Sequence, residues 1–129
     1  MTTAVICTAL MGLLVFGLGF AVSLFRGATK INYGLNEDPT SLFYKVSRAH
    51  GNSTEYAAMM CVMMLYVGAN DPAEWMVWTM IVMTVSRYLL VVGMITGKTM
   101  DGVNPLRAAG ATGTYICGLA LAAATYMAI

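Results

Sequence analysis

RAHGNSTEYAAMMCVMMLYVGAN, residues 48–70, places a short polar segment at the start of a long hydrophobic run. At about 100° per helical residue, Arg48, Asn52 and Glu55 fall within an arc of roughly 60°. One helix face would therefore carry a cation, an amide and a carboxylate. Because polar groups at the start of such a run need a reason to be there, we predict that this face binds a zwitterion.

The composition of the chain is that of a membrane protein. Hydrophobic residues make up 59% of the 129 positions and charged residues only 10%, far from the balance of a soluble domain. A helix needs about 20 apolar residues to cross a hydrocarbon layer of about 30 Å. Four stretches are long enough, at residues 4–25, 49–70, 73–95 and 106–129. We predict one domain, an all-α, integral-membrane bundle of four antiparallel helices.

The basic residues predict how the chain is oriented. They lie in or beside the first and third connections, as Arg26, Lys30, Lys45, Arg48, Arg87, Lys98 and Arg107. The positive-inside rule then places these connections in the cytoplasm and both termini on the non-cytoplasmic side. The first span is too long for a cleavable signal and follows no basic residue, so we expect it to be retained. This multi-pass protein would lie in the endoplasmic reticulum or another endomembrane of a eukaryote, or in a bacterial inner membrane.

The connections carry recognisable turn and cap signals. Residues 33–40 are rich in turn-forming types, and Ser41 or Thr40 can cap a helix that continues into the second span. Residues 96–105 should form a loop. In the last span, small residues recur at every fourth position, at Gly110, Thr114, Gly118 and Ala122. This stripe predicts close helix packing in lipid.

Several functions are excluded by simple counts. The net charge of +1 gives no signal for nucleic acid. An odd number of cysteines, all inside apolar runs, argues against a disulfide framework. His50 is the only histidine, so a metal or haem site built from several histidines is impossible, and we predict no metal.

Two opposite charges lie inside the predicted spans. Counted from the cytoplasmic ends at 1.5 Å per residue, Glu55 lies about 9 Å deep and Arg87 about 12 Å deep. An unpaired charge near the middle of a bilayer costs roughly 2.5–3.5 kcal/mol, so these residues should face each other or a wet cleft. A structural ion pair between the second and third helices is one interpretation, and a binding site is the other.

The wider polar set favours the binding site. It occupies the cytoplasmic half of three predicted helices and consists of Arg48, His50, Asn52, Glu55, Tyr56, Arg87, Tyr88 and Arg107. Arginines bind carboxylates in a bidentate manner, and Glu55 could bind an ammonium group. A thiol in such a ligand would need a nearby cation to hold it as the thiolate.

The motif Arg-Ala-His-x-Asn-x-x-Glu-Tyr, at the start of the second of four spans, resembles the MAPEG family, the membrane-associated proteins in eicosanoid and glutathione metabolism. The resemblance covers the whole chain in topology and the second helix in sequence. It implies a homotrimer that binds glutathione as co-substrate in clefts between subunits, and lipophilic small-molecule substrates that arrive from membrane lipid.

The resemblance also implies roles for individual residues. Arg107 matches the arginine that stands by the glutathione sulfur and would be catalytic. The binding positions of the family would be Arg48, His50, Asn52, Glu55, Tyr56, Arg87 and Tyr88, together with Arg26 or Lys30 after the first helix. The implied activity is that of a glutathione S-transferase, possible peroxidase activity included, which conjugates the thiolate to small lipophilic electrophiles.

Three positions depart from the family pattern. Val91 and Met94 stand where relatives often have a tyrosine, and Ala108 stands where one relative has a serine credited with helping the thiolate. A non-catalytic scaffold or accessory subunit of a larger membrane complex therefore remains an alternative. A transport pathway is a third hypothesis, because intramembrane charges also mark such routes.

Overall fold

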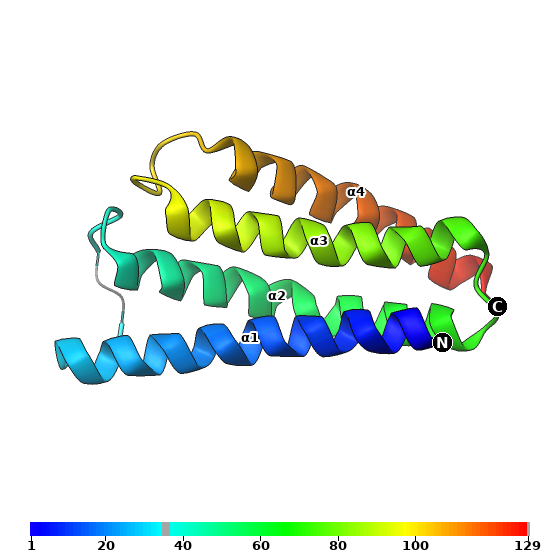
Figure 1. Ribbon diagram of the computed structural model, residues 1–129, viewed down its shortest axis with the longest axis horizontal. Coiled ribbons are helices and arrows are strands. Elements are labelled where there is room, and N and C mark those ends of the chain that lie inside the picture. Colours follow the sequence, from blue (N-terminus) through cyan, green and yellow to red (C-terminus); the bar gives the residue numbers. More distant parts are fainter. Residues whose placement is uncertain (35–36, 129) are drawn as a thin grey trace.

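The computed structural model describes residues 1–34 and 37–128, and Figure 1 shows that they form an antiparallel helical bundle. The helices are α1 (Thr2–Thr29), α2 (Leu42–Ala69), α3 (Glu74–Thr96) and α4 (Pro105–Met127). The chain is 81% helical, without strands in the described ranges. The predicted all-α four-helix architecture is confirmed. Residues 35 and 36 of the turn-rich segment, and residue 129 of the last predicted span, lie outside the described residues.

Local hydrogen bonds begin the two helices on which the site depends. The Ser41 hydroxyl oxygen accepts a bond of 3.1 Å from the Tyr44 backbone N–H, so the predicted cap of α2 is confirmed. Because α2 begins at Leu42, it starts well before the predicted span. At α4, Asn104 Oδ1 accepts from the backbone N–H of Arg107 at 3.0 Å, and Pro105 occupies the first turn.

The two ends of the bundle differ in the segments they carry. In Figure 1 both termini lie at the same end as the short α2–α3 connection, and the α1–α2 and α3–α4 connections lie at the opposite end. A backbone hydrogen bond of 3.0 Å from Met100 to Pro39 joins these two connections. This arrangement agrees with the expectation that both termini share one side. Which side is cytoplasmic stays a prediction.

The helices are not equally apolar. Stretches long and apolar enough to cross a membrane occur in α1, α3 and α4, but α2 has none among the described residues. Residues 49–70 are long enough but less apolar than the other three stretches, so a second membrane span at these residues stays a prediction. The physical reason is the motif itself, since Asn52, Ser53, Thr54 and Glu55 dilute the hydrophobic run that follows. The position of α2 in a membrane depends on its neighbours covering these groups.

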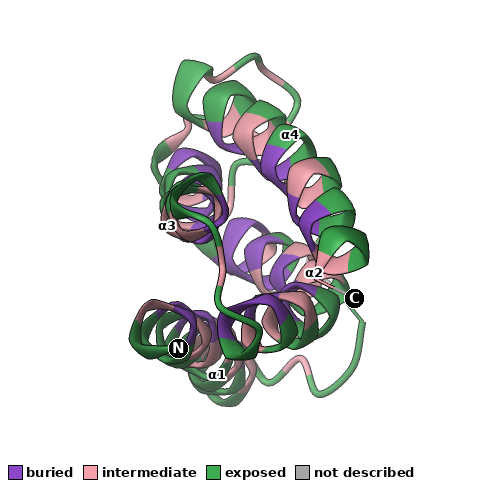
Figure 2. Cartoon of the chain, turned by 90° about the vertical axis from the view of Figure 1, so that its right-hand side faces the viewer, coloured by how far each residue is buried: buried purple, intermediate pink, exposed green. Residues whose placement is uncertain are grey.

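Packing is closest between α3 and α4, where backbones meet through glycines. A Cβ at Gly93 would overlap the backbone of Arg107, and a Cβ at Gly110 would overlap that of Leu90. Buried residues lie on the inward faces of the helices in Figure 2. Methionines fill much of the core, including Met11, Met60, Met64, Met80 and Met83. Their flexible side chains fill irregular space between the helices.

The predicted stripe of small residues on α4 is only partly correct. Gly110 and Thr114 are buried as predicted, whereas Ala122 is exposed. Each step of four residues rotates about 40° around the helix, so the stripe leaves the interface after two steps. The buried row instead continues through Cys117, Leu121 and Ala124.

Candidate functional site

Arg87 on α3 is almost fully buried, with 1% of its surface exposed. Its Nη2 donates to the Asn52 backbone oxygen at 3.1 Å, to Asn52 Oδ1 at 2.8 Å and to the Ser53 hydroxyl at 3.4 Å. The guanidinium carbon lies 5.2 Å from the centre of the Tyr56 ring, within the range of a cation–π contact. The polar motif of α2 therefore holds the arginine of α3.

The guanidinium of Arg87 is only partly satisfied. Its Nε and Nη1 atoms are buried and have no hydrogen-bond partner in the structure. A buried donor without a partner costs about 1–3 kcal/mol, and more when the group is charged. Nε and Nη1 point to different sides of the guanidinium, and each is a cationic donor that a single oxygen of an anion could accept from.

Arg87 lines a cavity of about 220 Å³ between α2, α3 and α4, which we call the Arg87 cavity. Its lining residues are Asn52, Tyr56, Arg87, Leu90, Met94, Arg107, Ala111, Thr114 and Tyr115. The structure thus brings together four of the predicted site residues from separate helices, namely Asn52, Tyr56, Arg87 and Arg107. Met94, noted as a departure from the family pattern, also reaches the cavity and presents a thioether there.

Arg107 is held at the rim of this cavity by the α3–α4 loop. Its Nη1 donates to the Met100 carbonyl at 2.8 Å, and its Nη2 donates to the Gly102 carbonyl at 2.7 Å. The Asn104 cap fixes the first turn of α4, and therefore the backbone of Arg107. The loop of residues 97–104 thus determines where the guanidinium lies.

Other predicted site residues on α2 point away from the cavity in the single chain. Arg48 and Glu55 are exposed. His50 packs against α1, where its Nε2 would lie 3.1 Å from a Cβ placed on Gly19. The hydrogen bonds of Arg87 go to Asn52 and Ser53 rather than to Glu55. The structural ion pair considered for Glu55 and Arg87 is therefore not the arrangement observed.

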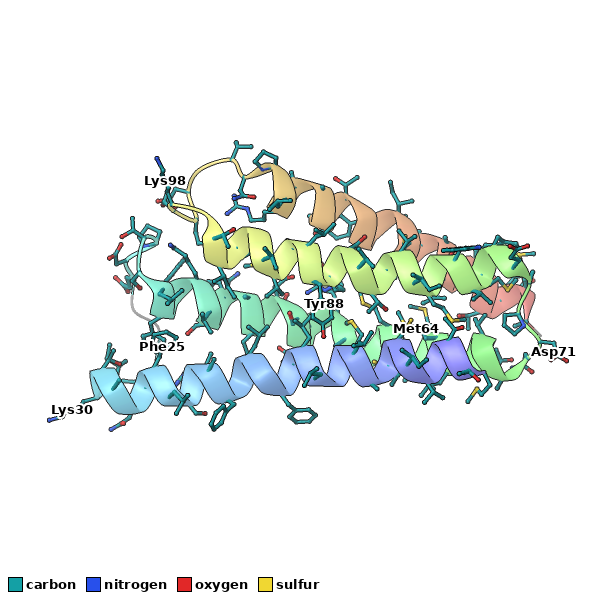
Figure 3. The ribbon with its side chains drawn as sticks, in the orientation of Figure 1. Phe25, Lys30, Met64, Asp71, Tyr88 and Lys98 are labelled. Carbon is teal, nitrogen blue, oxygen red and sulfur yellow. The ribbon has the colours of Figure 1, made fainter. Side chains whose placement is uncertain are left out.

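The remaining predicted binding residues lie beside α1. The Tyr88 hydroxyl donates to the Leu10 carbonyl at 2.9 Å, and Figure 3 shows Tyr88 on the side of α3 that faces α1. Arg26 donates to the Asn32 carbonyl at 2.6 Å and stabilises the chain that leaves α1. Lys30 is exposed at the end of α1 (Figure 3). Their roles in ligand binding stay predictions.

A second hollow adjoins the Arg87 cavity. It is a mostly apolar groove of about 460 Å³ between α2 and α4, which we call the methionine groove. Its lining residues are Glu55, Tyr56, Met59, Met60, Met63, Thr114, Tyr115, Gly118 and Leu119. Tyr56, Thr114 and Tyr115 line both hollows. A ligand could therefore extend from the cationic cavity into an apolar one.

Sequence reasoning missed two polar residues that line these hollows, Thr114 and Tyr115, and the Ser53 hydroxyl that accepts from Arg87. Ser53 lies inside the motif, but only its neighbour Asn52 was predicted to bind a ligand. Thr114 was assigned only to helix packing. The signal that could have found Tyr115 is its spacing from Arg107. Residues four, seven and eight positions after Arg107 lie on the same face of the helix as Arg107.

A buried arginine beside a cavity, inside a bundle with three helices long and apolar enough to cross a membrane, is the arrangement of a membrane protein. The family model of the MAPEG family matches residues 4–127 of the chain. This protein belongs to the MAPEG family. The family includes glutathione transferases and other members, some of them non-catalytic. No individual curated protein matches the chain.

Proposed function

We propose that this protein binds glutathione and transfers its thiolate to small lipophilic electrophiles. The observation that carries the proposal is the buried guanidinium of Arg87, which has two unpaired donors and belongs to a residue that lines a cavity with Asn52, Tyr56 and Arg107. A cation with free donors in an apolar bundle is costly unless it binds an anion. Glutathione offers two carboxylates, and MAPEG membership supports this ligand.

Different residues would bind different parts of the tripeptide glutathione. One carboxylate would accept from a free donor of the Arg87 guanidinium, and Asn52 keeps that guanidinium oriented. The cavity of about 220 Å³ is smaller than the usual ligand pocket of about 300–1,000 Å³, so it takes only part of the ligand. The remainder would lie along the exposed side of α2, where Glu55 would bind the amine and Arg48 the second carboxylate.

A second copy of the chain would then complete the site. Arg48 and Glu55 lie in the predicted cytoplasmic half of α2 and are exposed. A neighbouring protomer could cover their charged groups. In a homotrimer, which the family resemblance implies, each cleft would combine the Arg87 cavity of one protomer with a surface of the next. His50, Tyr88, Arg26 and Lys30, which lie toward α1 in the single chain, would contribute from such a neighbouring surface.

The chemical step needs an ionised sulfur. Arg107 at the rim would stabilise the thiolate, because a nearby cation lowers the pKa of a thiol. The sulfur then forms a bond to the electrophilic carbon, and the displaced electron pair leaves with the leaving group or moves onto an adjacent electronegative atom. Substrates dissolved in the bilayer would reach the sulfur from the lipid side.

Calorimetric titration of the detergent-solubilised protein with glutathione tests the binding proposal. We expect a saturable heat with the wild-type chain, reduced about 30- to 100-fold in affinity in Arg87→Gln, because a charge-assisted hydrogen bond to a buried cation is worth about 2–3 kcal/mol. Lys98→Gln, which removes an exposed cation from the loop, is the matched control. Absence of heat with the wild-type protein would end the glutathione proposal.

One observation favours the non-catalytic alternative. The Arg107 guanidinium already donates to two loop carbonyls, at Met100 and Gly102, so fewer of its donors remain for a sulfur. If the site binds glutathione but leaves its sulfur protonated, the protein acts as a binding or accessory subunit. The ultraviolet absorbance of the thiolate, measured in the same titration, separates the two functions.

A further inference from the structure

Tyr115 occupies an unusual place for a tyrosine in a membrane helix. It lies about 15 Å from the start of α4 and about 18 Å from its end, and 57% of its surface is exposed. Tyrosines of membrane proteins gather at the two interfaces, where the hydroxyl reaches water, as Tyr126 near the end of α4 can. At mid-helix the Tyr115 hydroxyl interacts with the side chain of Tyr56, and because a hydroxyl both donates and accepts it can also engage a further partner.

The surroundings of Tyr115 indicate what that partner is. Among the residues that line both hollows, Thr114 is buried and its hydroxyl donates to the Gly110 carbonyl at 2.8 Å. The ring of Tyr56 lies under the guanidinium of Arg87. The ring of Tyr115 contacts that of Tyr56 at 6.2 Å with an interplanar angle of 66°. Tyr115 is therefore the exposed phenol at the junction of the cationic and apolar hollows.

We infer that Tyr115 selects the second substrate, and that this substrate is a lipophilic electrophile with an oxygen acceptor conjugated to its reactive carbon, such as an α,β-unsaturated ketone. The inference rests on the proposed function. The apolar chain of the substrate lies in the methionine groove, and its carbonyl oxygen accepts a hydrogen bond from the Tyr115 hydroxyl. The adaptable side chains of Met59 and Met63 suit chains of varied shape.

The hydrogen bond acts on the charge that develops in the reaction. When the thiolate sulfur forms a bond to the β-carbon, the electron pair of the carbon–carbon double bond shifts, and the carbonyl becomes an enolate. The Tyr115 hydroxyl donates to this enolate oxygen and does not itself lose its proton. A proton from water then adds to the α-carbon, and no group leaves. A donor aimed at a developing oxyanion lowers the barrier of such a step.

The continuity of the two hollows identifies a small molecule as the occupant of the groove. Tyr56, Thr114 and Tyr115 line both hollows, so a ligand bound at Arg87 can extend directly into the groove. A helix from a second copy of the chain is the competing occupant, and the experiment below distinguishes the two.

Binding of two glutathione adducts to the solubilised protein tests this inference without requiring turnover. One is the adduct of an alkyl vinyl ketone, and the other is an S-alkyl glutathione of the same chain length without the ketone. In Tyr115→Phe we expect affinity for the ketone adduct to fall about three- to tenfold, the value of one hydrogen bond. The affinity for the S-alkyl compound should fall less than that for the ketone adduct, and any change in glutathione affinity is measured separately because Tyr115 also lines the Arg87 cavity. Tyr126→Phe is the matched control on the same helix.

A second variant tests the groove. Leu119→Trp should weaken both adducts and leave glutathione binding unchanged, whereas Leu24→Trp on the exposed surface of α1 should change neither. Equal affinity of wild-type and Tyr115→Phe for the ketone adduct, with glutathione still bound, overturns the role of Tyr115. If Leu119→Trp leaves adduct binding intact and instead changes the oligomeric state, a second copy occupies the groove. No binding of glutathione to the wild type would end the proposed function itself.

Discussion

One nitrogen of the Arg87 guanidinium donates to both the backbone oxygen and the side-chain oxygen of Asn52, at 3.1 Å and 2.8 Å. This double contact joins α3 to the polar motif of α2 and fixes the plane of the guanidinium. Because it uses only Nη2, it leaves Nε and Nη1 of Arg87 without partners. Asn52 therefore acts in this structure as the residue that orients the arginine, whatever further contact it makes with a ligand.

Replacing Arg87 with methionine should separate stability from binding. A buried, incompletely paired charge is often replaced by an apolar side chain with no loss, or with a gain of about 1–4 kcal/mol. We expect Arg87→Met to unfold thermally at or above the wild-type temperature while glutathione affinity falls at least 30-fold. Thermal unfolding in detergent and calorimetry measure the two effects. A large loss of stability would instead indicate that the arginine serves mainly as a structural contact.

Arg107 is expected to change the state of the sulfur more than the binding of glutathione. In Arg107→Ala the cation is lost from the cavity rim, so the thiolate absorbance of bound glutathione should disappear, while affinity falls less than in Arg87→Gln. Arg107→Lys keeps a charge but cannot span Met100 and Gly102 in the same way, and should retain part of the absorbance. Equal thiolate absorbance in all variants would contradict a role for Arg107 in ionising the thiol.

The contact between α3 and α4 predicts a stability difference between two glycine substitutions. Gly110→Ala places a methyl group against the backbone of Leu90, and forcing the helices apart should cost about 1–3 kcal/mol. Gly12→Ala on α1 meets no atom within 4 Å, so it should be neutral or stabilise by up to about 1 kcal/mol. Thermal unfolding of both variants checks the pair. Similar stability of the two variants would refute the close packing.

The α1–α2 connection should respond to acid through Asp38. The Thr40 side chain and backbone donate to Asp38 Oδ1 at 2.7 Å and 2.9 Å, and these bonds hold the pKa of the carboxyl below its ordinary value. A lowered pKa means that the stabilisation is present above about pH 4 and is lost as pH falls through the folded-state pKa. Hydrogen exchange at the Thr40 amide should therefore become less protected in strong acid. In Asp38→Ala that pH dependence should be absent.

The sequence predicted the fold better than the site. Hydrophobic runs of membrane length, separated by turn signals, were enough for four antiparallel helices, and Ser41 was correctly expected to cap α2. The spacing of small residues on α4 predicted the helix interface only in part, since Ala122 is exposed. Depth along each helix suggested that Glu55 and Arg87 might pair, but depth does not specify rotation about the helix axis.

The amino-acid sequence by itself determined the helices, their order and the residue types available to bind a charged thiol peptide. Those properties depend on local hydrophobicity, turn chemistry and a single continuous motif. Only the tertiary structure decided that Arg87 turns to Asn52, that the loop holds Arg107 at a cavity rim, and that Tyr115 lies between two hollows. The physical reason is that each of these relationships depends on how far one helix is rotated against another. For α3 and α4, the close backbone contacts at Gly93 and Gly110 limit that rotation.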